Sequence, residues 1–280
     1  MPSTAAVPSG STFFITDPRR RGLEPARFEP AERISTGIKE GSDVVALPGG
    51  RFLIVGDTSD KVGLLEADGK VTKFQLPGLP SNKPSQMEGV AYDWVKHHLI
   101  ISREESRELY RYEWNPNKSK PPELKKKIDV KHMGGPTNKG IEGLAYLPGE
   151  QSPWGVPVML GVKEGKPRQL MMFDAGGSKS YTTVKLDPRI PDLCKDFSAI
   201  AVDPKTGHIY ISSDASAVVI EVELKGTGQN VTATLLRDPF SIEDEKKKPL
   251  KRIEGLTFNE QGDLFVLTEN DGDLLRLARK

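Results

Sequence analysis

Cysteine is almost absent from this sequence, and other features that mark common protein classes are missing too. The single cysteine, Cys194, excludes an intramolecular disulfide framework. No apolar run approaches the ~20 residues of a membrane-spanning helix, and the first residues lack the cationic and apolar segments of a secretory signal. We therefore expect a cytoplasmic location by default, with export after removal of a leader as the open alternative.

The sequence also lacks an excess of charge of either sign, and it lacks familiar catalytic motifs. Forty basic residues nearly cancel thirty-nine acidic ones, and a net charge of +1 gives no case for nucleic acid or an anionic membrane as a partner. The sequence contains no GxSxG, P-loop, GxGxxG or HExxH motif. No His and Cys residues cluster at a spacing that would suit zinc. The partner that we expect is a small molecule or a protein, and the sequence leaves the oligomeric state open.

Helical periodicity is absent as well, whereas turn residues are abundant: 27 glycines and 22 prolines indicate many turns between short strands. What is present is a repeat of an apolar strand, a turn, a β-branched strand, a polar turn and a third apolar strand. The repeats start near residues 43, 88, 142, 198 and 254. Their aligned positions recur about 45 to 56 residues apart, close to the ~40–50 residues of a four-stranded propeller blade.

The repeat predicts an all-β chain that forms a single β-propeller domain over residues 1–280. Five blades of four antiparallel strands are expected. The last repeat ends after three strands, so we expect the N-terminal stretch Arg27–Ile38 to supply the missing strand and close the ring, with the rest of residues 1–40 partly flexible. The segment Thr12–Thr16 also resembles a strand, which leaves a sixth blade open.

Acidic residues recur at two positions in each repeat. The first position opens the inner strand and the second closes the next strand. Antiparallel pairing should bring both to the same face of the disc, with the first set around the central channel. The first set is Asp43, Glu88, Glu142, Ser198 and Glu254, and the second set is Asp57, Glu104, Glu164, Asp214 and Glu269.

Carboxylates that converge in a narrow channel must hold protons or bind a cation. Oxygen ligands without His or Cys suit a hard ion, and we expect Ca²⁺ rather than Mg²⁺ at the first set. The alternative is that these acids only cap strand ends or pair with Lys and Arg. We expect the second set to contact the ligand together with three cations, Arg103, Lys139 and Lys163.

One histidine is a candidate general base. His132 lies in the glycine-rich loop HMGGPTNKG just before Glu142, where it could hang over the channel mouth. The alternative is an ordinary surface histidine on a long loop.

The ordered motifs EGVAYD, KGIEGLAYLPG, FSAIAVDPKTGHIYISSD and IEGLTFNEQGDLFVLTEN resemble the SdiA-regulated family of bacterial proteins. The resemblance runs from about Ser42 to Leu277. It implies a propeller related to esterase-like phytases and gluconolactonase-type hydrolases, with a channel calcium at Glu88, Glu142 and Glu254. Two departures are Ser42-Asp43-Val44 in place of EGL in the first repeat and the insertion GEQSPWGVP in the third.

Two functions are consistent with these observations. The first is a calcium-binding propeller that acts as a ligand- or protein-binding module. The alternative is a metal-dependent hydrolase of an ester, lactone or phosphoester, with His132 or a carboxylate of the ring as the base. Propellers host both functions, and the missing catalytic motifs favour binding.

Overall fold

The computed structural model describes residues 26–38, 40–81, 84–133, 140–243, 248–269 and 272–280. Within these ranges nearly all of the regular secondary structure is β-strand, with a short α-helix, α1 (Ile190–Leu193), and a 3-10 turn, η2 (Lys131–Met133). The all-β prediction is therefore confirmed. The strand-like segment Thr12–Thr16 lies outside the described residues.

The described strands form three four-stranded sheets and one sheet of eight strands. The first sheet contains β2 (Gly41–Leu47), β3 (Arg51–Gly56), β4 (Val62–Leu65) and β5 (Val71–Phe74). The second contains β6 (Met87–Asp93), β7 (His98–Arg103), β8 (Glu108–Glu113) and β9 (Glu123–Asp129). The third contains β18 (Ile253–Phe258), β19 (Leu264–Thr268), β20 (Asp273–Arg279) and β1 (Phe28–Ser35), which pairs antiparallel with β20.

The eight-stranded sheet consists of two antiparallel units. The first unit is β10 (Ile141–Leu147), β11 (Val158–Lys163), β12 (Gln169–Asp174) and β13 (Tyr181–Leu186). The second unit is β14 (Ala199–Val202), β15 (Ile209–Ser213), β16 (Val218–Thr227) and β17 (Asn230–Leu235). The outermost strands β13 and β17 pair in parallel, with Lys185 opposite Thr232 and Leu186 opposite Ala233. This pairing joins two neighbouring units along their outer edges.

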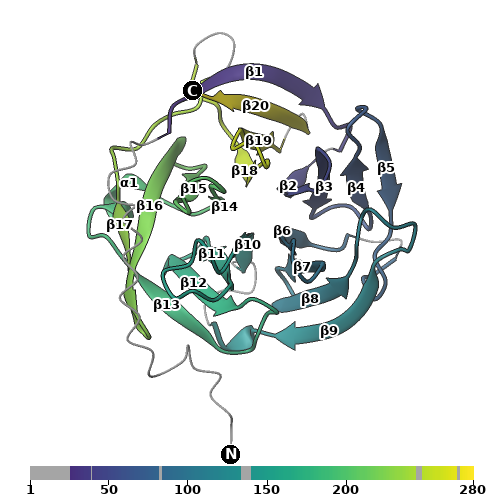
Figure 1. Cartoon of the computed structure of the whole chain (residues 1–280), viewed down its shortest axis with the longest axis horizontal. Coiled ribbons are helices and arrows are strands. Elements are labelled where there is room, and N and C mark those ends of the chain that lie inside the picture. The colour runs from purple at the N-terminus through teal and green to yellow at the C-terminus, as the bar shows by residue number, and fades with distance from the viewer. Residues whose placement is uncertain (1–25, 39, 82–83, 134–139, 244–247, 270–271) are drawn as a thin grey trace, which may run out of the picture.

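The first strand of each antiparallel unit lies innermost, around the centre of the molecule (Figure 1). These strands are β2, β6, β10, β14 and β18, and each of them contacts the next, with β18 returning to contact β2. Apolar residues fill the spaces between adjacent sheets. For example, Ile100 and Leu109 of the β6–β9 sheet share a buried cluster with Met159 and Phe173 of the next unit. The arrangement is a β-propeller, which confirms the predicted fold class.

Tight turns connect the strands where the sequence predicts them. In the Pro48-Gly49-Gly50 turn between β2 and β3, the two glycines have φ angles of +77° and +74°. A side chain would strain the backbone in this region, so glycine suits both positions.

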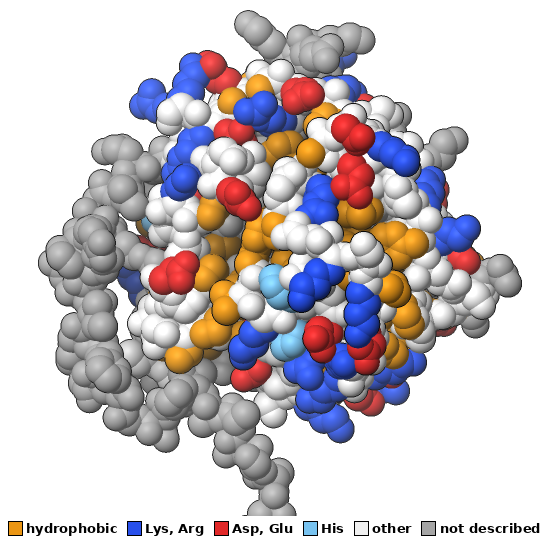
Figure 2. Space-filling model, turned by 45° about the vertical axis from the view of Figure 1, so that its right-hand side comes forward, with side chains coloured by type: hydrophobic (Ala, Val, Ile, Leu, Met, Phe, Trp, Pro, Cys, Tyr) orange, Lys and Arg blue, Asp and Glu red, His pale blue; other side chains and the backbone are white. Residues whose placement is uncertain are grey.

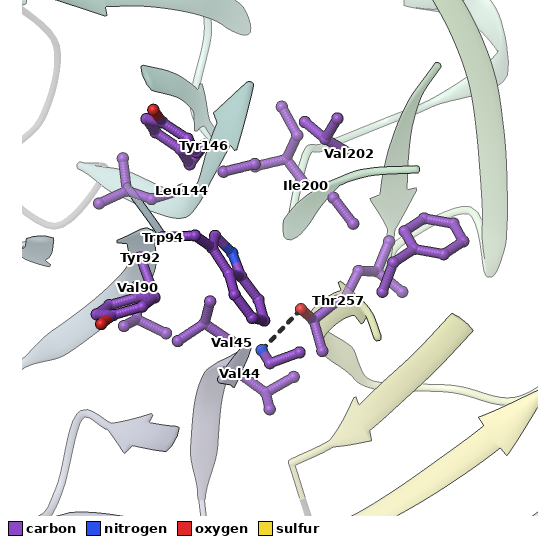
Figure 3. Close-up of a pocket in the computed structure, with 15 residues that line it drawn as sticks. Val44, Val45, Val90, Tyr92, Trp94, Leu144, Tyr146, Ile200, Val202 and Thr257 are labelled. Carbon is purple, nitrogen blue, oxygen red and sulfur yellow. Dashed lines mark hydrogen bonds between the residues drawn. The ribbon is translucent and has the colours of Figure 1, made fainter. Parts of the chain in front are cut away.

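The two ends of the channel differ in chemistry. Each inner strand starts at the acidic end and runs toward a pocket at the opposite end, where Trp94, Tyr146, Val202 and Phe258 are part of the lining (Figure 3). The hydroxyl of Thr257 accepts a hydrogen bond from the backbone N–H of Ala46 at 3.0 Å and so links two inner strands. A metal ion is therefore expected at the acidic end, which we call the acidic mouth.

The outer surface mixes charges of both signs. Figure 2 shows basic and acidic side chains interspersed with hydrophobic ones on the face in view, in agreement with the nearly balanced charge of the chain. Among the described residues, no helix combines the length and the apolar character needed to cross a membrane.

Candidate functional site at the acidic mouth

A β-bulge at the start of the inner strands explains the recurring Glu-Gly pair. The register shifts between Ile141 and Gly143 in β10, and between Ile253 and Gly255 in β18. Glu142 and Glu254 are the extra residues in these bulges, and a bulge re-aims the side chain that it carries. The bulge therefore turns one glutamate of each strand toward the mouth.

The glycine after each glutamate allows the inner strands to approach one another. A Cβ atom on Gly143 would lie 3.0 Å from the backbone of Ala199, and one on Gly255 would lie 3.0 Å from the backbone nitrogen of Val44. Such contacts are tighter than most that real side chains make, so a larger residue would require the neighbouring backbone to shift. The EG pattern thus combines a mouth-facing carboxyl with close packing of the ring.

The first repeat differs from the prediction by one residue. In β2 the register shifts between Gly41 and Asp43, so Ser42 occupies the bulge and Asp43 takes the place of the glycine. The sequence pattern, in contrast, groups Asp43 with the glutamates of the other repeats. The difference arises because a one-residue bulge changes the face to which a side chain points.

Asp43 is completely buried inside the ring. Its Oδ1 accepts a hydrogen bond from the N–H of Val44 at 2.8 Å, and its Oδ2 accepts from Val90 at 2.8 Å and from Leu144 at 3.4 Å. One carboxyl therefore connects β2, β6 and β10. Burial raises the pKa of Asp43 well above its ordinary value, although the three N–H donors act in the opposite direction.

Carboxyls of both predicted sets meet at the mouth. Burial, followed by the charges of Glu104 and Asp57, raises the pKa of Glu88 well above its ordinary value, and Ser42 donates a hydrogen bond to Glu88. Burial, followed by the charges of Asp214 and Glu269, raises the pKa of Glu254 to about 8.

Further acidic groups extend this network. Glu254 is also close enough to feel the charges of Asp196 and Glu164. Burial and the charges of Glu40 and Glu269 raise the pKa of Asp57. The structure thus brings members of the two sets into one electrostatic network, whereas their binding roles stay predictions.

The remaining predicted ring residues have local partners. Ser198 donates a hydrogen bond to the carbonyl of Ile253 at 2.7 Å, and its hydroxyl lies 2.9 Å from that of Ser212. The charge of Glu142 raises the pKa of Lys163, which indicates that the two side chains lie near each other. Ser198 therefore links β14 to β18, and the ligand role of both residues stays a prediction.

Strained backbone flanks the ring at three of the five inner strands. Glu40, Gln86 and Arg252 have φ angles of +53°, +54° and +56°, and each lies two residues before the bulge residue of its strand. The N–H of Gln86 donates to the carbonyl of Asp57 at 2.9 Å, and the N–H of Glu40 donates to that of Glu269 at 3.1 Å. Left-handed conformations of non-glycine residues are costly and concentrate at functional sites.

The predicted cations have different surroundings. Arg103 donates to the carbonyl of Ser85 and lies over the ring of Tyr110, 5.8 Å from its centroid, so its guanidinium already has protein partners. Lys163 is completely buried, and its ammonium donates to the carbonyls of Gly165 at 3.1 Å and Pro167 at 3.4 Å. Lys139 lies outside the described residues, and His132 falls in η2.

One mouth residue is missing from the predicted site. Ser42 donates a hydrogen bond to Glu88, but the bulge that contains Ser42 is not visible in the apolar pattern of the sequence.

The donor set at the mouth suits a hard cation in its chemistry. Carboxylate and hydroxyl oxygens are the ligands that Ca²⁺ prefers. Within the described ranges, no three His, Cys, Asp or Glu side chains are already grouped in a way that could hold a metal ion. A cation would therefore require rotation of the glutamates toward one another.

Comparisons with known proteins agree with this fold. The PQQ-bound aldose sugar dehydrogenase of Streptomyces coelicolor is 13% identical, with 92% of this chain and 99% of that one covered and a TM-score of 0.59. Myxococcus xanthus glutaminyl cyclase is 15% identical, with 92% and 99% covered and a TM-score of 0.56. A putative gluconolactonase is 14% identical, with 91% and 82% covered and a TM-score of 0.50.

At such low sequence identities, structural similarity shows a shared fold but does not show a shared activity. A family model, in contrast, matches most of the sequence: the model described as SdiA-regulated aligns with residues 49–271. That range contains the Glu-Gly motifs of β6, β10 and β18. The chain belongs to the SdiA-regulated family.

Proposed function

We propose that the acidic mouth binds a divalent cation, Ca²⁺ in preference to Mg²⁺, and that the propeller uses this mouth to bind a small molecule or a protein. The observation that carries the proposal is the convergence of half-buried carboxyls, since Glu88 and Glu254 each lie near further acids. Carboxyls in such surroundings are stabilised by protons or by a cation.

Glu88, Glu142 and Glu254 are the proposed ligands, with the hydroxyls of Ser42 and Ser198 beside them. All of these donors are oxygens, and flexible sites with many oxygen ligands favour Ca²⁺ over the smaller Mg²⁺. A bound cation would offer a Lewis acid to an oxygen of the ligand. The bulges at the starts of the inner strands place these side chains near one another.

We expect added Ca²⁺ to raise the unfolding temperature and EDTA to reverse the rise. Ligand binding to the folded state alone stabilises it by about 2.7 kcal/mol at a hundredfold excess over Kd, a shift of several degrees for a chain of this size. Isothermal titration of EDTA-treated protein with Ca²⁺ and with Mg²⁺ measures the preference. Absence of both a binding isotherm and a thermal shift would refute the proposal.

Glu142→Gln removes one proposed ligand charge, and we expect it to weaken Ca²⁺ binding at least tenfold. Glu260→Gln is the matched control, because Glu260 is exposed in the turn between β18 and β19, away from the mouth. Equal Ca²⁺ affinity of the two variants would place the cation elsewhere.

Hydrolysis of an ester, lactone or phosphoester is the second candidate. It is favoured by Glu254, whose pKa of about 8 allows a carboxyl to hold and release a proton near neutral pH. His132 is the alternative base. The Ca²⁺-loaded protein, incubated with aryl esters, lactones and phosphodiesters, separates the candidates, since a binding module turns over none of them.

We also propose that the propeller has five blades and that β1 closes its ring. Two observations support this: β1 pairs with β20 along its length, and five inner strands contact one another in a cycle. Arg237 donates to the carbonyl of Ala26 at 2.9 Å, and the ring of Phe28 lies 5.9 Å from that of Tyr210 and 6.0 Å from that of Phe258.

If β1 closes the ring, Phe28→Ala should lower the free energy of unfolding by about 2 kcal/mol, because partly buried aromatic contacts to two blades are lost. Glu32→Ala, at an exposed position of the same strand, is the control and should change stability little. Urea unfolding measures both. Equal stability of the two variants would contradict a closing role for β1.

A further inference from the structure

The pocket at the opposite end of the channel from the acidic mouth has aromatic walls. Residues of all five inner strands line it, around a space of about 390 Å³ that includes its opening to solvent (Figure 3). Four of the lining residues are aromatic: Tyr92, Trp94, Tyr146 and Phe258. Trp94 and Tyr146 are only half-buried, so their rings are accessible from solvent. Mostly apolar, concave sites of this kind are typical of small-molecule binding.

The aromatic rings are held in place by contacts outside the pocket. The hydroxyl of Tyr92 donates to the carbonyl of Trp114 at 3.1 Å and lies 2.9 Å from Nδ1 of His97. The indole of Trp94 packs edge-on against Tyr92, with ring centroids 5.9 Å apart and planes at 71°. Figure 3 shows this indole in the middle of the lining side chains, with Tyr146 to one side. Fixed rings lose little freedom when a ligand binds.

A buried carboxylate lies behind this wall. Asp93 is located between Tyr92 and Trp94 in the sequence and is 1% exposed. Its Oδ1 accepts the N–H groups of Val95 at 2.9 Å and Lys96 at 3.0 Å. Among the described residues, its Oδ2 has no hydrogen-bond partner at a normal distance, and no lysine or arginine forms an ion pair with Asp93. Buried charges are usually paired, so this one favours a cation close by.

The surrounding groups direct the charge of Asp93 toward the pocket. His98 lies opposite Asp93 in the β6–β7 pair, but burial and the charge of Arg111 lower the pKa of His98, so the imidazole is neutral at pH 7. Arg111 itself donates to the carbonyl of Gly176 at 3.2 Å. The hydroxyl of Tyr146 faces the carboxyl of Asp93. A phenol polarised by a carboxylate has a more electron-rich ring, and this ring lines the pocket.

We propose that this pocket binds a methylated ammonium group. The faces of aromatic rings attract organic cations, and tryptophan does so most strongly. A trimethylammonium group presents its charge through apolar methyl groups, which suit the aliphatic lining of Val45, Ile200 and Val202. A metal ion or a primary ammonium needs oxygen ligands instead. The site lies at the other end of the channel from the acidic mouth and does not depend on a cation bound there.

Choline and its neutral isostere 3,3-dimethyl-1-butanol test the need for charge, when each is titrated calorimetrically into the full chain in EDTA. We expect choline to bind and the isostere to bind about tenfold more weakly or worse, because the two share a shape and differ in charge. Failure of choline to bind, or equal affinities of the two, would overturn the proposal.

A parallel titration with the amide of Nα-acetyl-trimethyllysine identifies the source of the ammonium group. Tighter binding of this compound than of choline would support the proposal with a modified peptide as the ligand. Tighter binding of choline would support it with a free small molecule as the ligand.

Two pairs of variants test the residues. Trp94→Leu removes the central aromatic face and should weaken choline binding about tenfold or more, whereas Trp94→Phe keeps an aromatic face and should retain most of the affinity. Asp93→Asn keeps Oδ1 for the turn and removes the charge, so it should weaken the binding of choline but not that of the isostere. Asp68→Asn is the matched control in an exposed turn, where Oδ1 accepts the N–H of Lys70 at 3.0 Å.

The acidic mouth is a competing place for an organic cation, and Glu142→Gln separates the two ends of the channel. Choline binding that Trp94→Leu weakens and Glu142→Gln leaves unchanged would support the pocket, whether or not Ca²⁺ binds at the mouth. A larger loss in Glu142→Gln than in Trp94→Leu would place the ammonium group at the mouth and overturn the proposal. Equal choline affinity of Trp94→Leu and the wild type would overturn it as well.

Discussion

Glu254→Gln should make the metal-free protein more stable at pH 8 than the wild type. Burial and the neighbouring charges of Asp214 and Glu269 raise the pKa of Glu254 from an ordinary value of 4.5 to about 8 in the folded state. A folded-state pKa above the unfolded one means that the folded protein binds more protons between these values. The stability that the protonated carboxyl provides is complete below about pH 4.5 and is lost as pH rises to about 8.

The expected gain for Glu254→Gln is roughly 2–4 kcal/mol at pH 8, from the ~1.4 kcal/mol that one unit of pKa represents, and close to zero at pH 4.5. Urea unfolding in EDTA across this range measures it. Glu260→Gln makes the same change of charge at an exposed site and should show no such pH dependence. A loss of stability in Glu254→Gln at pH 8 would contradict the electrostatic account.

This result would also show a conflict between stability and function at the mouth. The three proposed cation ligands lie where the ring brings carboxyls together without a compensating cation for each. Arg252 compensates part of the network, because its guanidinium forms an ion pair with Glu269 and its N–H donates to Asp214. Glu88, in contrast, has a hydroxyl partner in Ser42 and acidic neighbours.

Much of the fold could be read from the sequence because each repeat carries its own signals. The glycine turn before Arg51 and the apolar alternation predict hairpins that the structure contains. The recurring Glu-Gly pair marks three of the inner strands, β6, β10 and β18, where the glycine lies close to the neighbouring strand. The resemblance to the family, carried by the same motifs, is confirmed by the match over residues 49–271.

Other features could not be read because they depend on contacts between repeats. The parallel pair β13–β17 joins strands from neighbouring units and has no signal in either strand. The local partners of Arg103, the carbonyl of Ser85 and the ring of Tyr110, also have no signal in the sequence, and its contact with a ligand stays a prediction.

The position of Asp43 is the clearest example of this limit. The sequence Ser42-Asp43-Val44 is compatible with two positions for Asp43: at the mouth, or one residue further along the strand inside the ring. The position of the bulge determines which of the two is adopted. In the structure, Asp43 is buried inside the ring, at the place where the β6, β10 and β18 repeats have glycine. Its carboxyl accepts hydrogen bonds from three inner strands there.

Asp43→Ala should therefore be among the most destabilising single substitutions in this chain. It leaves the backbone N–H groups of Val90 and Leu144 without their acceptor, and each unsatisfied buried donor costs ~1–3 kcal/mol. The contact of Val44 with Oδ1 is lost as well. We expect a loss of about 3 kcal/mol or more in the free energy of unfolding, measured with urea at pH 7.

Two controls separate this role from a role in cation binding. Asp68→Ala makes the same substitution at an exposed turn, where one oxygen accepts the N–H of Lys70 at 3.0 Å, and should cost less than 1 kcal/mol. Asp43→Asn keeps one acceptor oxygen, so its stability should lie between those of Asp43→Ala and the wild type. If Asp43→Asn folds with wild-type stability but loses Ca²⁺ affinity, Asp43 is a ligand of the cation and not the link between three inner strands.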